Sequence, residues 1–176
     1  MKPSHLLLIL LTLSSSLLPF ASANNIGEVA SICSHTDYSF LCIYASVTYG
    51  QSYAVIDAAS LLAMHIKMTT DHTQTAKVIA STFAANPTTT PQVKQALGVC
   101  LKQYDDAFDD LAKGTAAVAG HDAGTANSML SAVISYYSTC DDAFAEIYAA
   151  NPLAKQDDFL MKMVSNALAL AQLILE

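Results

Sequence analysis

Four carboxylates lie close together at Asp105, Asp106, Asp109 and Asp110, a grouping that could bind calcium or carry out acid and base chemistry. On a helix, residues four apart are neighbours, so positions 105 and 109, and likewise 106 and 110, would hold like charges side by side. That arrangement is typical of a solvated helix edge. The alternative is that some of these carboxylates contact a basic protein surface.

Two histidines, His65 and His72, are seven residues apart and would lie near one helix face. Two histidines with no carboxylate predicted beside them provide too few ligands for a typical metal site. The sequence also lacks a His-Glu-x-x-His, a Gly-x-Ser-x-Gly and a phosphate-binding glycine loop. We therefore predict no metal, no cofactor and no catalytic site, and expect a protein that is not an enzyme.

The four cysteines, at positions 33, 42, 100 and 140, form an even set that suits disulfides in an oxidising compartment. Their spacing lacks the Cys-x2-Cys pairs that are usual in structural zinc sites. Three pairings are possible. Cys33 and Cys42 are near enough in sequence to close a small loop, which leaves Cys100 to pair with Cys140.

The chain opens with Lys2 and an apolar run over residues 6–13, and Ala21-Ser22-Ala23 follows as a small-x-small cleavage pattern. The apolar run is too short to span a bilayer. We predict a signal peptide over residues 1–23 and one mature domain over residues 24–176. The expected location is extracellular.

The mature chain is acidic, with 7 lysines and no arginine against 15 Asp and Glu, a net charge of −8 with histidine neutral. Nucleic acids and anionic membrane surfaces are therefore poor partners. A basic protein surface fits this charge better.

Helix-breaking residues divide the mature chain at Tyr49-Gly50, Asn86–Pro91, Ala119–Asp122 and Asn151-Pro152. Four long segments of about 25 to 33 residues result. A shorter region, residues 26–49, precedes them and carries the first two cysteines.

Three of the long segments have apolar residues at alternating spacings of four and three, the pattern of a helix with one buried face. The stripes are Leu97, Leu101, Tyr104, Phe108 and Leu111 in the second segment, Ala126, Leu130, Val133, Tyr137, Cys140, Phe144 and Ile147 in the third, and Leu160, Val164, Ala167, Ala171 and Ile174, widened by Met163 and Leu170, in the fourth. The first segment has a weaker stripe of Val55, Ala58, Leu62 and Ile66. The polar, β-branched run over residues 69–73 should bend or fray that helix.

These patterns predict an all-α fold, an up-down-up-down four-helix bundle in which consecutive helices are antiparallel. Cys100 lies 20 residues before Gly120 and Cys140 lies 20 after it. At about 1.5 Å per residue, both lie roughly 30 Å from the turn, at the same height. The bundle geometry therefore supports the Cys100–Cys140 pairing.

Several segments resemble motifs of one family. The segment Cys33–Cys42 resembles its Cys-x-x-Thr-x-Tyr-x-x-x-Cys opening, and Cys100–Leu111 is similar to its Cys-x3-Tyr-x2-Ala-x3-Leu pattern. Leu130-Ser131-Ala132 with Thr139-Cys140 looks like its Leu-Ser-Ala-Ala-x5-Thr-Cys, and Val164–Leu170 resembles its final helix. The family is that of the plant invertase and pectin methylesterase inhibitors, and the likeness runs from about Ile26 to Leu175.

The resemblance implies a four-helix bundle with an N-terminal helical hairpin and bridges joining the first cysteine to the second and the third to the fourth. It also implies noncovalent, reversible inhibition of a wall enzyme by covering its substrate cleft. Many invertase inhibitors have Pro-Lys-Phe after the turn where this chain reads Gly120–Thr125. Pectin methylesterase is therefore the favoured target and acid invertase, from the cell wall or the vacuole, the runner-up. A secreted helical carrier of a small apolar ligand is the alternative from another class.

We expect the partner to contact the third long helix, because tyrosine combines apolar area with a hydrogen-bonding tip and is enriched at binding hot spots. The alternative for this region is that Tyr137 is core and Tyr136 only borders it. The expected interface residues are Ser135, Tyr136, Ser138 and Thr139, with Asp106 and Asp110 of the acidic edge. When free, the protein should be monomeric.

Overall fold

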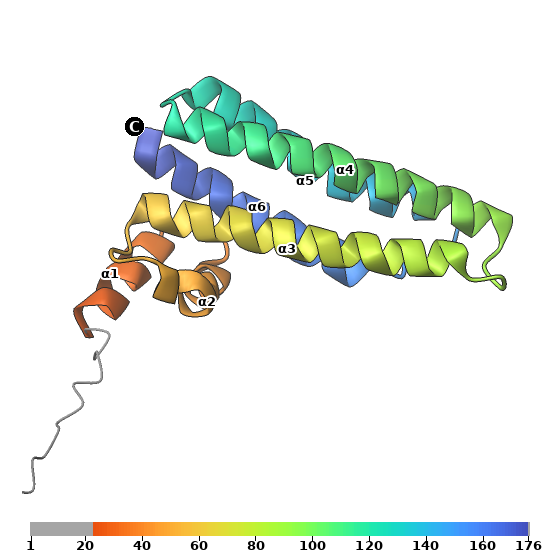
Figure 1. Cartoon of the computed structure of the whole chain (residues 1–176), viewed down its shortest axis with the longest axis horizontal. Coiled ribbons are helices and arrows are strands. Elements are labelled where there is room, and N and C mark those ends of the chain that lie inside the picture. The colour runs from red at the N-terminus through yellow and green to blue at the C-terminus, as the bar shows by residue number, and fades with distance from the viewer. Residues whose placement is uncertain (1–22, 176) are drawn as a thin grey trace, which may run out of the picture.

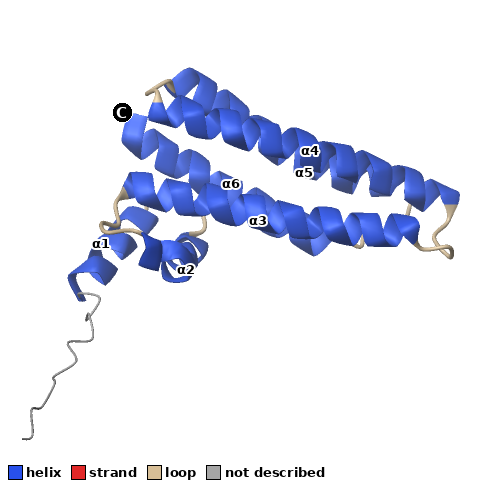
Figure 2. Ribbon diagram, in the orientation of Figure 1, coloured by secondary structure: helices blue, strands red, loops and turns tan. Residues whose placement is uncertain are grey.

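The computed structural model describes residues 23–175, which are helical almost throughout (Figures 1 and 2). Its elements are α1 (Ala23–Cys33), α2 (Ser39–Tyr49), the short 3-10 helix η1 (Gly50–Ser52), α3 (Ala58–Ala85), α4 (Pro91–Ala119), α5 (Ala123–Ala145) and α6 (Ala154–Leu175). The four long helices form the predicted bundle, and α1 and α2 form a hairpin beside one end of it (Figure 1). The all-α prediction is confirmed. The predicted signal peptide lies outside the described residues except for Ala23.

Side chains at the helix starts explain where the long helices begin. Asp57 and Ser60 form a capping box at α3, in which the Asp57 carboxylate accepts a hydrogen bond from the Ser60 amide at 2.8 Å. Thr90 caps α4 ahead of Pro91, and Asp122 accepts from the Thr125 amide at 3.0 Å to start α5. The caps at Thr90 and Asp122 fall at turns that the sequence predicts, whereas Asp57 lies seven residues after the predicted break at Tyr49-Gly50.

The core includes the predicted stripes of α5 and α6, whose members are buried except for the half-buried Ile147 and Ile174 at the two ends. On α4 the buried face is rotated slightly about the helix axis relative to the predicted stripe. Leu101 and Phe108 are half-buried, whereas Cys100 and Ala107 are fully buried. Small residues explain the difference, because they let α5 approach closely; a Cβ on Gly114 would lie 3.2 Å from Cδ2 of Leu130.

The expected fraying of α3 over residues 69–73 is wrong, since α3 is helical without interruption from Ala58 to Ala85; the expected bend stays a prediction. Thr69 and Thr73 are fully buried, and each hydroxyl donates to the carbonyl four residues earlier, at 2.7 and 2.8 Å. The Thr73 hydroxyl also hydrogen-bonds the Tyr137 hydroxyl of α5 at 2.7 Å. Tertiary packing thus overrides local propensity. Val55 is not part of the buried stripe, since it precedes α3 and is exposed.

By length and composition alone, α6 could cross a membrane. In this structure it is the fourth helix of the bundle and packs against α3 and α5. Its Asp157 and Asn166 are fully buried and hydrogen-bonded to residues outside α6. These contacts identify α6 as a core helix of the bundle.

Candidate functional site

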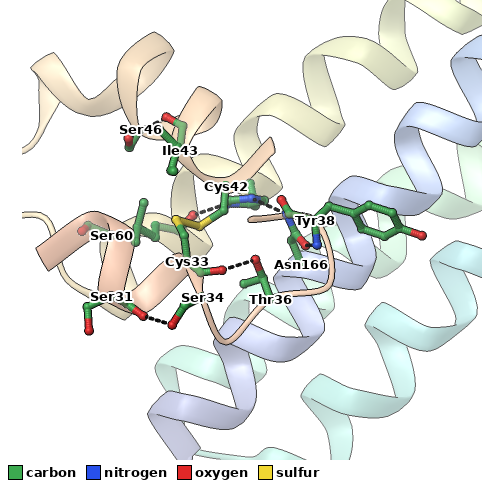
Figure 3. Close-up of a disulfide and its surroundings, with 12 residues drawn as sticks. Ser31, Cys33, Ser34, Thr36, Tyr38, Cys42, Ile43, Ser46, Ser60 and Asn166 are labelled. Carbon is green, nitrogen blue, oxygen red and sulfur yellow. Dashed lines mark hydrogen bonds between the residues drawn. A yellow bond between two sulfur atoms is a disulfide. The ribbon is translucent and has the colours of Figure 1, made fainter. Parts of the chain in front are cut away.

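The first bridge, Cys33–Cys42, closes the α1–α2 hairpin, and one buried amide attaches this hairpin to the bundle (Figure 3). The Oδ1 atom of Asn166 accepts from the backbone amide of Tyr38 at 3.0 Å, and its Nδ2 donates to the Tyr38 carbonyl at 2.9 Å. Nearby, the Ser165 hydroxyl donates to Asp37 at 2.7 Å. The hairpin is therefore held in one register on α6.

His65 of α3 lies beside this amide and is fully buried. Its Nδ1 lies 2.8 Å from the Leu61 carbonyl and its Nε2 lies 3.4 Å from Nδ2 of Asn166, so the neutral ring donates through Nδ1 and accepts through Nε2. Burial lowers the pKa of His65, and the hydrogen bond to Leu61 opposes that effect only in part. His72 is exposed and packs its ring against Phe159, with centroids 4.7 Å apart. Within residues 23–175, no cluster of three or more potential metal ligands includes either histidine.

The second bridge, Cys100–Cys140, joins α4 to α5 and lies beside a buried polar network. The Tyr104 hydroxyl donates to Oδ1 of Asp157 at 2.7 Å, and Nδ2 of Asn151 donates to Oδ2 of the same carboxylate at 3.3 Å and to Asp141 at 2.6 Å. The Tyr104 hydroxyl also lies 3.7 Å from the Cys140 sulfur. This network connects α4, α5, α6 and the α5–α6 turn.

Asp157 is fully buried and no cation pairs with it in the described part of the chain. Burial raises its pKa to about 7, and the neighbouring Asp141 carboxylate adds to the rise, while the hydrogen bonds from Tyr104 and Asn151 oppose it. Burial also raises the pKa of Asp141. Sequence reasoning did not single out Asp157, although it continues the apolar stripe of α6 one step before Leu160.

The α4–α5 face brings together two of the predicted interface residues, Tyr136 and Asp110. The Tyr136 hydroxyl donates to Oδ2 of Asp110 at 2.8 Å, and Lys113 donates to Oδ1 of Asp110 at 2.7 Å. Burial alone would raise the pKa of Asp110, but these two hydrogen bonds outweigh it and lower the pKa. The prediction of a solvated edge is therefore wrong for Asp110, which is only 6% exposed. Its charge is neutralised within the molecule.

The other predicted interface residues lie around this pair. Ser135 is exposed, and Ser138 and Thr139 are half-buried with hydroxyls that donate to the Ser135 carbonyl at 3.0 and 2.7 Å. Asp106 pairs with Lys102 at 2.5 Å. Tyr137 is fully buried core and Tyr136 is half-buried at its edge. The face therefore consists of ordered hydroxyl groups around one tyrosine ring.

A groove of about 340 Å³ lies between the start of α5 and the end of α6, lined by Ala123, Gly124, Asn127, Leu168, Ala171, Gln172 and Leu175. It is only partly enclosed, unlike the pockets that bury most of a small ligand. The described surface is thus made of helix faces and turns, which suit contact with another protein.

Residues 27–170 match the family model of the plant invertase/pectin methylesterase inhibitors. The protein is therefore of the class of helical, disulfide-bridged enzyme inhibitors and is not an enzyme. The chain belongs to the plant invertase/pectin methylesterase inhibitor family.

A curated relative, Pectinesterase inhibitor 12 of Arabidopsis thaliana, is 32% identical over 78 residues, which cover 44% of this chain and 45% of that protein. Two solved structures share the fold. One, a mutant form of a pectin methylesterase inhibitor from Arabidopsis, has a TM-score of 0.68 and 18% identity and covers 82% of this chain and 95% of the other. The other, a pectin methylesterase inhibitor from Arabidopsis thaliana, has a TM-score of 0.63 and 17% identity over 84% and 96% of the two chains. At these identities the structures establish the fold alone.

Proposed function

We propose that this chain is a secreted inhibitor of pectin methylesterase that forms a reversible, noncovalent complex covering the substrate cleft of the enzyme. The family match over residues 27–170 carries the proposal, because the description of that family names two target enzymes, invertase and pectin methylesterase. The relative that matches part of the chain is named a pectinesterase inhibitor, which favours the esterase. Loss of residues 1–23 as a signal peptide would deliver residues 24–176 to the cell wall.

The turn after α4 supports the same choice of target. It reads Gly120-His121-Asp122 and leads directly into α5, without the Pro-Lys-Phe that many invertase inhibitors have there. Acid invertase is the second candidate, since the family model names both enzymes.

The direct experiment compares the oxidised protein, residues 24–176, with purified plant pectin methylesterase and with acid cell-wall invertase from about pH 5 to pH 7. We expect loss of esterase activity and unchanged invertase activity. Loss of invertase activity alone would reverse the assignment of the target. Full activity of both enzymes would overturn the proposed function.

Within this function, the α4–α5 face around Tyr136 is the proposed contact surface. We expect Ser135→Arg to weaken inhibition at least 10-fold, because a long charged side chain would block a packed interface centred on this exposed position. Ser81→Arg on α3 is the matched control, since Ser81 is also exposed and its hydroxyl likewise donates to the carbonyl four residues earlier. Equal inhibition by the two variants would remove this face from the proposal. Unfolding in urea would verify that both variants are folded.

A further inference from the structure

Tyr148, in the turn between α5 and α6, has a backbone conformation that its side chain does not suit. Its φ is 53°, in the left-handed region where a bulky residue is rarely found. The Tyr148 amide donates to the Ala145 carbonyl and the Ala149 amide donates to the Phe144 carbonyl, both at 3.0 Å. This hydrogen-bond pair defines a helix end at which glycine is the preferred residue in the place of Tyr148.

The Tyr148 side chain makes no packing contact that would offset this backbone strain. It is 99% exposed, so its ring packs against no part of the described chain. Glycine at this position would relieve the backbone and uncover no core. The fold therefore does not account for tyrosine at this position.

The turn between α4 and α5 offers a comparison inside the same molecule. His121 has a φ of 55° and the same two hydrogen bonds, from His121 to Val118 at 3.1 Å and from Asp122 to Ala117 at 2.9 Å. Histidine is among the residues enriched in left-handed conformations, whereas tyrosine is not. The two helix ends share one geometry, and only the one with Tyr148 has a large aromatic side chain pointing into solvent.

The charges around Tyr148 define the chemistry of a partner. Asp142 and Glu146 are exposed at the C-terminal end of α5, where the helix dipole disfavours carboxylates. None of the five ion pairs within residues 23–175 involves either residue, and α5 contains no lysine. A shallow groove of about 110 Å³ between α4 and α5 has Glu146 and Ile147 in its lining. A fully exposed phenol ring and two exposed, unpaired carboxylates at the same helix end are complementary to arginine or lysine side chains, which can stack on the ring or pair with the acids.

We propose that Tyr148, with Asp142 and Glu146, forms a docking surface at the end of α5 for a cationic patch on the inhibited enzyme. This inference rests on the proposed function, because the partner is that enzyme. The surface follows the α5 helix beyond the face around Tyr136. This docking surface lies at the opposite end of α5 from the Gly120–Asp122 turn.

The test uses the full oxidised protein with Tyr148→Gly and, as matched control, His121→Gly. Both changes place glycine, which adopts a positive φ without steric cost, at a left-handed helix end, so both should raise Tm, by ~2–4 °C. We expect Tyr148→Gly to weaken inhibition about 30-fold, as loss of an interface hot spot does, and His121→Gly to leave it unchanged. A more stable protein that inhibits less well would separate binding from folding at this position.

A loss of inhibition by Tyr148→Gly smaller than threefold, with the wild type potent, would overturn the inference and leave the proposed function intact. An equal loss in His121→Gly would overturn it too, because turn geometry would then be the cause. A lower Tm for Tyr148→Gly would show that the fold needs this side chain, which contradicts the argument. A wild type that inhibits neither enzyme would overturn both proposals together.

The charged part of the surface has its own readout. We expect inhibition by the wild type to weaken as the salt concentration increases, because the carboxylates and the cations that they contact on the enzyme would be exposed to solvent. The double variant Asp142→Asn, Glu146→Gln should show a smaller salt dependence. An unchanged salt dependence would exclude these carboxylates from the docking surface.

Discussion

Replacing Cys100 and Cys140 together by alanine is expected to lower the free energy of unfolding by about 4 kcal/mol. The bridge closes a loop with a sequence separation of 40 residues, and the entropy that it removes from the unfolded chain grows with the length of that loop. Both sulfurs are also fully buried, so alanine leaves unfilled space between α4 and α5. About 4 kcal/mol is a large share of the net stability of a typical domain, about 5–15 kcal/mol.

Urea unfolding of the oxidised protein measures this loss, and replacement of Cys33 and Cys42 by alanine is the matched control. That bridge has a separation of only nine residues, so the same model gives about 3 kcal/mol. The variant without the Cys33–Cys42 bridge should unfold at a higher urea concentration than the variant without the Cys100–Cys140 bridge. The reverse order would contradict the assignment of the Cys100–Cys140 bridge as the main covalent support of the bundle.

The wild-type protein is expected to lose stability as the pH rises towards 7, because Asp157 is buried without a cation. Its pKa is about 7 in the folded state, against an ordinary value of 3.8 that applies to the unfolded chain. Between these two values the folded protein holds a proton that the unfolded chain has released, so stability falls with rising pH. The slope is at most about 1.4 kcal/mol per pH unit, and the total at most about 4 kcal/mol. This contribution is complete below about pH 4 and is lost as the pH rises through 7.

His65 acts in the opposite direction. Its pKa is lowered by burial from 6.5, so the unfolded chain takes up a proton at this residue more readily than the folded protein does. Its contribution to stability is present above pH 6.5 and is lost as the pH falls towards its lowered pKa. The two buried groups therefore oppose each other as the pH falls below 6.5, whereas above pH 6.5 only Asp157 of these two still changes the stability.

Asp157→Asn separates the two effects. We expect this variant to lose the decline in stability on the alkaline side and to keep the decline on the acidic side that His65 causes. Urea unfolding between pH 4.5 and pH 7.5 measures both slopes, and Asp158→Asn at the exposed neighbouring position is the control. A pH profile shared by the wild type and Asp157→Asn would show that Asp157 is not the titrating group.

Hydrophobic periodicity predicted the four long helices and their turns because it records which face of each helix is buried. The same information placed Cys100 and Cys140 at one height, where the structure forms their bridge. The short hairpin and its bridge were also predictable, from the close spacing of Cys33 and Cys42 and from the family resemblance. Side chains at the turns, such as Asp122, cap the helices at the positions where the packing of the bundle requires them to begin.

The buried polar residues were not predicted, because their partners lie on other helices. Asp157 resembles any surface aspartate until Tyr104 and Asn151 are placed beside it. Thr69 and Thr73 were interpreted as helix breakers, although their hydroxyls are satisfied by α3 itself and by Tyr137. A usable signal was present, since Asp157, Thr69 and Thr73 all lie in step with the apolar stripe of their helix. The predicted interface residues other than Asp110 lie wholly or partly at the surface, where periodicity carries little information.

The order of the helices along the chain also sets an order of assembly. Each long helix packs against the next, and α3 finally packs against α6 to close the ring. Because a short turn joins them, α4 and α5 can pair and bring Cys100 to Cys140 before α6 docks. We expect oxidation to lock this antiparallel pair before α6 packs against it, so that α6 docks onto a covalently fixed template and the buried carboxylate of Asp157 enters its site in that docking step.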